Sequence, residues 1–146
     1  MRSLLFLAFM ALISACEAQT KPIKFGKDAC SHCRMIISDP RFGAELVTTK
    51  GKVFMFDDLN CYWNYRKEQK IQETDIAHSV VVLFNQPGTF RNAGEACFLG
   101  SREIRSPMGS GVAAFDSKEA CDAHPEAARG KQLTWEEVSK VCNKCA

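Results

Sequence analysis

The sequence predicts an α+β domain of two small ββα units, which follows an N-terminal signal and a tether. Strand-like runs come in pairs, and a helical segment follows each pair. Both helical segments begin after a Phe-Asp step, at residues 56–58 (FDD) and 115–117 (FDS). These observations indicate an internal repeat. We place one unit at about residues 28–72 and the second at about 76–126.

The first unit begins with a predicted β-hairpin. Residues 42–49 and 53–56 have strand character, and the Lys-Gly-Lys sequence at 50–52 between them is a turn signal. The two aspartates that follow can cap a helix over about residues 59–68.

The second unit has the same order of elements. Its strands are predicted at residues 79–84, 95–99 and 112–115. Asp116 and Glu119 can act as a capping pair for a helix over 118–124.

A C-terminal segment, residues 132–146, combines a helix with a CxxC pair. The helix is predicted over residues 134–141, and Cys142 and Cys145 follow it. The distance in sequence from the CxxC pair at 30–33 far exceeds ordinary zinc-ribbon spacing, so a single four-cysteine zinc site is not favoured.

The N-terminus has the pattern of an exported bacterial-type lipoprotein. An apolar run, Leu4 to Ile13, is too short to span a bilayer comfortably, and small residues then lead to Cys16. We expect residues 1–15 to be removed as a signal peptide. Cys16 would carry the lipid, which anchors by about 0.8 kcal/mol per buried CH2. An ordinary signal peptide with a chance cysteine is the alternative.

A tether is predicted between this lipid and the folded part. Residues 16–27 are polar and contain Pro22 and Gly26. The domain then spans residues 28–146 and faces the periplasm from a membrane surface.

Length and charge favour one small domain without a nucleic-acid partner. Removing residues 1–15 from the 146 leaves 131, which suits a single compact domain. The formal charge of +2 becomes +1 without Arg2 and gives no electrostatic footprint for nucleic acid. The sequence also lacks a nucleophile–base pair, a phosphate loop or a paired acid–base signature, which argues against an enzyme.

Cysteine is unusually frequent. Seven cysteines follow Cys16, and an odd number cannot pair completely within one chain. An exported chain can keep disulfides, and at least one thiol is left for chemistry, metal or an external partner. The terminal pair could form a local disulfide, carry metal, or pair with one of the cysteines in the second unit. The seven are Cys30, Cys33, Cys61, Cys97, Cys121, Cys142 and Cys145.

The densest motif is CSHCRM at residues 30–35, which places two thiols and a thioether together. Thiolate and thioether ligands select Cu(I), whereas zinc sites gain nothing from methionine. A redox CxxC usually opens a helix, but the residues after this one read as an extended segment and a turn. Soft-metal capture, a structural zinc or disulfide, and redox exchange all stay open. Met35 could also be a core residue.

Two further motifs could contribute to a site. Met108 lies in a glycine-rich loop at residues 107–111 (PMGSG), where it is either a second thioether donor or a packed tip residue. In the FDDLNC sequence at 56–61, the aspartates are expected to cap a helix or to orient a ligand. Cys61 is expected to be a small buried hydrophobe.

Taken in order, these motifs resemble the NosL family. The resemblance rests on Cys16, CSHCRM at 30–35, ISDPRFGAELV at 37–47, FDDLNC at 56–61 and PMGSGVAAF at 107–115. Proteins of this family are periplasmic copper-chaperone lipoproteins associated with nitrous oxide reductase assembly. The resemblance therefore implies a pair of ββα units, one Cu(I), and delivery of copper towards that reductase or its maturation machinery.

Carried over by position, the resemblance implies Cys33, Met35 and Met108 as Cu(I) ligands, with Cys30 as a reserve or transfer ligand. The sequence departs from the family pattern at Arg34, where glycine is common. It also departs in two extra thiols at 97 and 121 and in the cysteine-containing tail.

The sequence thus predicts a membrane-anchored Cu(I) metallochaperone that is not an enzyme. Two alternatives belong to other classes. One is a thiol–disulfide oxidoreductase that uses Cys30 and Cys33, and the other is a lipoprotein stapled by structural zinc or a disulfide.

Overall fold

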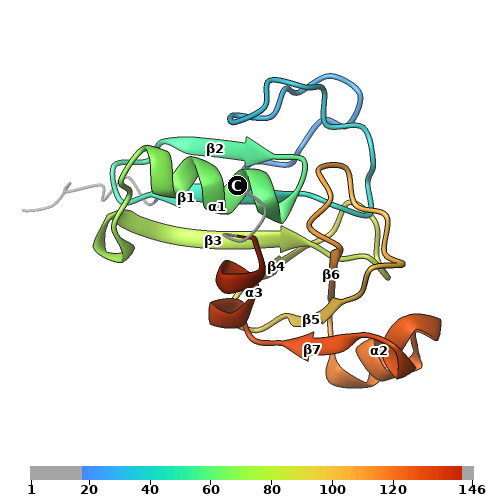
Figure 1. Cartoon of the computed structure of the whole chain (residues 1–146). Coiled ribbons are helices and arrows are strands. Elements are labelled where there is room, and N and C mark those ends of the chain that lie inside the picture. Colours follow the sequence, from blue (N-terminus) through green and yellow to red (C-terminus); the bar gives the residue numbers. More distant parts are fainter. Residues whose placement is uncertain (1–17, 143–146) are drawn as a thin grey trace, which may run out of the picture.

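The structure, a computed structural model, describes residues 18–142 as two antiparallel sheets with three α-helices packed around them (Figure 1). The first sheet contains β1 (Ala44–Thr48), β2 (Val53–Phe56), β3 (Ile76–Val82) and β4 (Phe90–Asn92). The second contains β5 (Cys97–Gly100), β6 (Val112–Phe115) and β7 (Lys131–Leu133). The α-helices are α1 (Leu59–Glu68), α2 (Lys118–Ala123) and α3 (Trp135–Cys142), and short 3-10 turns occupy Glu73–Asp75 and Pro125–Ala128. This confirms the predicted α+β class.

The strand order is β2-β1-β3-β4 in the first sheet and β6-β5-β7 in the second. The predicted hairpin is present, because β1 and β2 pair across a turn in which Gly51 has a positive φ of 76°. The next helix also matches its predicted range, and the Asp58 side chain caps it by accepting from the Asn60 N–H.

The valine-rich strand β3 differs from its predicted place. The sequence grouped it with the second unit, but β3 pairs with β1 and so forms the middle of the first sheet. Val81 and Val82 are buried there, and a strand with neighbours on both sides accommodates such a run. The short strands β4 and β7 were not predicted, because three residues carry too little alternation to identify a strand.

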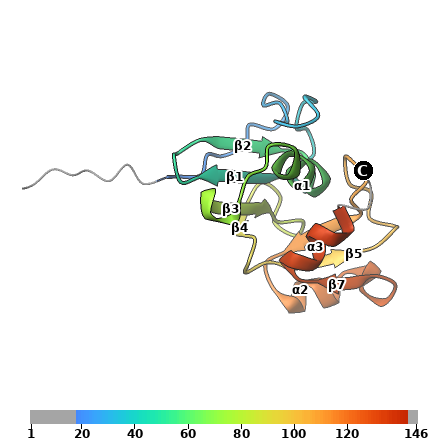
Figure 2. The ribbon, with the colours of Figure 1, turned by 60° about the vertical axis from the view of Figure 1, so that its left-hand side comes forward.

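Aromatic side chains join the two sheets. Tyr62 and Trp63 on α1 contact Trp135 at the start of α3, with ring centroids 5.2 and 4.7 Å apart. Trp135 in turn stacks on Phe98 of β5 at 5.5 Å. Both ribbon views place α3 between α1 and the second sheet (Figures 1 and 2). These offset and edge contacts bind the two halves through one shared core.

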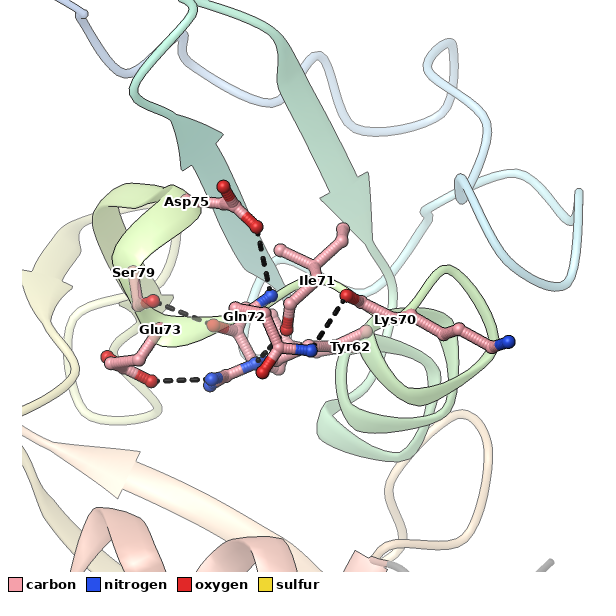
Figure 3. Close-up of polar contacts among 8 residues, drawn as sticks. Tyr62, Lys70, Ile71, Gln72, Glu73, Asp75 and Ser79 are labelled. Atoms are coloured by element: carbon pink, nitrogen blue, oxygen red, sulfur yellow. Dashed lines mark hydrogen bonds and ion pairs between the residues drawn. The ribbon is translucent and has the colours of Figure 1, made fainter.

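Polar contacts fix the turn that follows α1 (Figure 3). The hydroxyls of Tyr62 on α1 and Ser79 on β3 are 2.7 Å apart. The Arg66 guanidinium pairs with the Glu73 carboxylate at 2.5 Å and donates to the Ile71 carbonyl at 3.2 Å. The helix is therefore tied to β3 and to the connection that leads into it.

Residues 18–27, which were predicted to be part of a tether, instead pack against the domain. The Lys21 N–H donates to both carboxylate oxygens of Glu45, at 2.8 and 3.1 Å, and Ile23 is buried against the first sheet. Burial raises the pKa of Glu45, and the backbone donor partly compensates for the cost of enclosing that carboxylate. The Ala18 carbonyl oxygen also lies 2.8 Å from the His78 ring nitrogen, so the segment contacts the domain from Ala18 onward.

Some sequence predictions fall outside the described residues. These are the signal peptide, the lipidation site Cys16 and the terminal Cys145. Within residues 18–142, none of the helices combines the length and the apolar character that crossing a bilayer requires.

Candidate metal centre

The loop that carries the CSHCRM motif is clamped to the edge of the first sheet. The Ser31 N–H donates to the Met55 carbonyl at 2.7 Å, and the Met55 N–H donates to the Ser31 hydroxyl at 3.1 Å. Within the loop, the Cys30 N–H donates to the Met35 carbonyl at 2.8 Å, and Ala29 and Ile36 form an isolated β-bridge. These bonds close the motif into a tight turn and hold its thiols next to the end of β2.

Four side chains bring possible ligand atoms together at this place. The sulfurs of Cys30, Cys33 and Cys61 and a carboxylate oxygen of Asp57 all lie within 4.8 Å of one another. We call this group the thiol cluster. Two of its members come from the loop, and the other two come from the β2–α1 junction and the first turn of α1. Three sulfurs and one oxygen at such distances form a donor set for a soft or borderline metal ion.

Asp57 has a carboxylate oxygen without a partner. Its Oδ2 accepts from the Cys33 thiol at 3.3 Å, whereas Oδ1 is buried and has no hydrogen-bond partner among residues 18–142. The residue is 4% exposed. A buried oxygen that lacks a donor is costly, and a cation among the neighbouring sulfurs would offset that cost.

The three thiols differ in acidity. The Cys61 thiol donates to the Cys30 sulfur, and the backbone N–H groups of Asp57, Cys33 and His32 also donate to it, so the pKa of Cys30 falls to about 6. Burial is the main cause that raises the pKa of Cys33 to about 11. The hydrogen bond to Cys30 is the main cause that raises the pKa of Cys61. Of the three sulfurs, that of Cys30 therefore becomes a thiolate most readily.

The two methionines lie on loops beside the thiol cluster and are open to solvent. Met35 is 58% exposed and Met108 is 38% exposed. Asp58 holds the Met108 loop by accepting from the Met108 N–H at 2.8 Å, and the Asn60 amide donates to the Met108 carbonyl at 2.9 Å. In Figure 1 this loop reaches from the second sheet to the start of α1.

Glycine is required where the Met108 loop turns back to β6. Gly111 has a φ of +64°, and a Cβ atom there would lie 2.8 Å from the Ser101 carbonyl oxygen. A larger residue would push the loop off the neighbouring backbone. Of the two glycines in the PMGSG sequence, Gly111 serves a close backbone approach, whereas a Cβ atom at Gly109 would meet no atom within 4 Å.

The structure brings together two of the four predicted metal residues, Cys30 and Cys33, within the thiol cluster. The side chains of Met35 and Met108 are exposed on the flanking loops. Sequence reasoning missed Asp57 and Cys61 as members of the same group. Cys61 is buried as expected, but its sulfur belongs to the cluster. The available signal was only that both flank the helix start in the FDDLNC sequence, because Asp57 precedes the cap Asp58 and lies outside α1.

Known proteins share features of this chain in both sequence and structure. The NosL family model matches residues 22–142. The chain belongs to the NosL family. No curated protein matches it in sequence. Among solved structures, the chain is similar to the copper chaperone NosL from Shewanella denitrificans, at 22% identity and a TM-score of 0.70. That match covers 83% of this chain and 96% of the other, and it shows that the two share a fold.

The backbone at Arg34 has a conformation that is unusual for a residue with a side chain. Its φ is +68°, in the left-handed region that favours glycine. The resemblance noted above implied glycine at this position, and glycine adopts such a conformation without strain. The strain lies between Cys33 and Met35, where the chain reverses direction.

We predict that Arg34→Gly stabilises the protein by about 1 kcal/mol, because glycine relieves the left-handed strain and keeps the N–H that donates to the Cys30 carbonyl. Urea unfolding of the copper-free protein measures the change. Lys70→Gly is a matched control, since Lys70 has a φ of +52° at an exposed turn away from the motif. A stabilising Lys70→Gly combined with a destabilising Arg34→Gly would contradict the strain argument.

Proposed function

We propose that this NosL-family chain is a membrane-anchored periplasmic chaperone that binds Cu(I) and supplies it for the assembly of nitrous oxide reductase or a related copper enzyme. The observation that carries the proposal is the thiol cluster, flanked by two exposed methionines. Thiolates and thioethers are the ligands that Cu(I) prefers. The similar fold of the copper chaperone NosL from Shewanella denitrificans supports the same function.

In this proposal the first ligands of Cu(I) are the sulfurs of Cys33, Met35 and Met108. Cys33 is the partly exposed thiol of the cluster, and both methionines are reachable from solvent. Cys30 is the reserve or transfer ligand, since its sulfur is buried and already favours the thiolate. A low-coordinate site disfavours Zn(II) and leaves room for an incoming ligand of the client. Copper then moves by ligand exchange, without a redox step.

Binding requires Cys33 to lose its proton, because a thiolate binds the metal and a thiol does so poorly. The Asp57 carboxylate lies 3.3 Å from the Cys33 sulfur and accepts its hydrogen bond. As the Cu–S bond forms, the S–H bond breaks and the proton passes to Asp57 Oδ2 and then to solvent. The carboxylate thus serves as proton acceptor at the entry of the site.

The opening of the site also suits contact with another protein. Within residues 18–142, the large hydrophobic side chains that are exposed are Met35, Ile36 and Met108. All three lie on the two loops beside the thiol cluster. Exposed apolar groups at one place indicate an interaction surface, and methionine is enriched in protein interfaces. A client that docks here would meet the thioether ligands first.

The proposed anchor at Cys16 adds to this function. A lipid there confines the protein to the membrane surface and raises its effective concentration near membrane-linked partners. Ala18, which contacts His78 of the domain, lies two positions after Cys16 in the sequence, so the connection is short. The metal site is therefore kept near the membrane.

A structural zinc site is the second candidate, and one observation favours it. The thiol cluster offers four donors, which is the number that zinc takes in structural sites. Redox exchange is less favoured, because the most acidic thiol, Cys30, is fully buried and out of reach of a substrate disulfide. Metal analysis of protein isolated under reducing, anaerobic conditions separates the three: copper, zinc or neither.

We predict that Cys33→Ala combined with Met108→Ala weakens Cu(I) binding by roughly 100-fold or more, because two of the proposed ligands are lost. Titration of Cu(I) against a competing chelator measures the affinity. Cys97→Ala is the matched control, since it removes a thiol outside the cluster and should leave the affinity unchanged. Unchanged affinity in the double variant would refute this ligand assignment.

We predict that the wild-type protein fractionates with membranes when it is expressed with its own N-terminus, and that Cys16→Ser no longer carries lipid. Mass spectrometry of the mature protein detects the acyl groups, and fractionation of the cells gives the distribution. A Cys16→Ser protein that still carries lipid would contradict the assignment.

We predict that a denitrifying host without this gene produces nitrous oxide reductase with a lower copper content and accumulates nitrous oxide. Gas measurement and metal analysis of the purified reductase provide the readouts. Complementation with the wild type should restore both, and the Cys33→Ala, Met108→Ala variant should not. A reductase with full copper content in the deletion strain would exclude it as the client.

A further inference from the structure

Two thiols of the second sheet form a pair that the metal site does not use. Cys97 is the first residue of β5, and Cys121 lies in α2. Burial and the neighbouring Cys97 thiol raise the pKa of Cys121. Cys121 is completely buried in a hydrophobic cluster with Leu99 and Phe115, and the partly exposed Cys97 packs against that cluster.

The pairing of β5 with β6 and the start of α2 determine where the two thiols lie. Cys97 lies opposite Phe115 in the antiparallel β5–β6 ladder. The chain then turns at Ser117, whose hydroxyl accepts from the Ala120 N–H at 3.1 Å and caps α2. The helix packs against β5 and β6, so that Cys121 and Cys97 share one hydrophobic cluster. Strand pairing and a helix cap thus determine the contact.

We propose that Cys97 and Cys121 form a structural disulfide when the protein meets a disulfide oxidant, as it would in an oxidising compartment. The two cysteines pack in one hydrophobic cluster on elements that contact each other, and a disulfide can form between cysteines whose Cα atoms lie within about 7 Å. Exported proteins keep such bonds. The proposal concerns a covalent link within the second sheet and does not depend on copper binding.

The chemistry proceeds by two exchanges. Cys97, the more exposed thiol, loses its proton to solvent, and its thiolate attacks the oxidant disulfide, which releases one thiolate and leaves a mixed disulfide on Cys97. The Cys121 thiol then loses its proton and attacks the Cys97 sulfur, which releases the second thiolate. The two cysteines are oxidised by two electrons, and the oxidant is reduced to two thiols.

The bond would tie α2 to β5 and close a loop over residues 97–121. A closed loop restricts the unfolded chain and so stabilises the folded domain. It would also remove two thiols from competition for metal. The cysteines of the thiol cluster lie in the other half of the chain and are left out of the bond.

The sequence allows a direct test. Trypsin cuts after Arg91, Arg102, Lys118 and Arg129, so Cys97 falls in peptide 92–102 and Cys121 in peptide 119–129, each with one cysteine. The full chain is purified reduced and copper-free, treated with oxidised glutathione, and quenched in acid. Its remaining thiols are alkylated before digestion. We expect one linked peptide pair, two hydrogens lighter than the sum of its parts, which dithiothreitol separates.

The cysteines of the thiol cluster serve as an internal comparison, because they fall in peptides 28–34 and 53–66. Alkylation of both Cys97 and Cys121, a glutathione adduct that persists on Cys97, or a link from Cys97 to a different cysteine would each overturn the proposal. With Cys121→Ala, the glutathione adduct on Cys97 should persist, because the resolving thiol is gone.

A stability measurement gives an independent readout. The oxidised wild type should melt about 5 °C or more above the reduced protein. The Cys97→Ala, Cys121→Ala double variant should lose this redox-dependent difference, which controls for oxidation elsewhere in the chain. An equal difference in the double variant would assign the stabilisation to other thiols and refute the proposal.

Discussion

The arrangement of the site depends on the hydrogen bonds that the Asp58 carboxylate accepts. One of its oxygens accepts the Asn60 N–H at 2.9 Å and caps α1, and the other accepts the Met108 N–H at 2.8 Å. A residue at a helix start thereby fixes a loop fifty positions away in the sequence. The carboxylate is almost fully buried, and these backbone donors make its burial tolerable because a charged acceptor forms strong hydrogen bonds.

Asp57 and Asp58 therefore differ in how their carboxylates are hydrogen-bonded. Both carboxylate oxygens of Asp58 accept hydrogen bonds from backbone N–H groups. In Asp57, one oxygen accepts from the Cys33 thiol and the other is buried without a hydrogen-bond partner among residues 18–142. The first arrangement is complete without a ligand, and the second is not. This difference marks the thiol cluster, and not the helix cap, as the place where a cation would be stabilising.

The elements that the sequence predicted well are those that local chemistry determines. A turn with a positive-φ glycine gave the first hairpin, and Asp58 gave the start of α1. The predicted cap of α2 was wrong, because Ser117 caps that helix while the Asp116 carboxylate accepts from the Asn85 and Gln86 side chains. The place of β3 depends on pairing with β1, which no local pattern encodes. Cys61 was read as a buried hydrophobe for a similar reason. Its burial follows from the helix pattern, but its proximity to Cys30 follows from a loop that folds over a distant strand.

The burial of the sulfurs gives the proposed copper transfer a direction. The thioethers of Met35 and Met108 are exposed, Cys33 is partly exposed, and Cys30 and Cys61 are enclosed. A client can therefore replace the thioethers while Cys33 still holds the ion. Thioethers are neutral and need no proton to leave, whereas release from Cys33 is assisted when a proton from solvent reaches its sulfur through Asp57 Oδ2. The order of exposure is thus also the order in which ligands can be exchanged without leaving a bare ion.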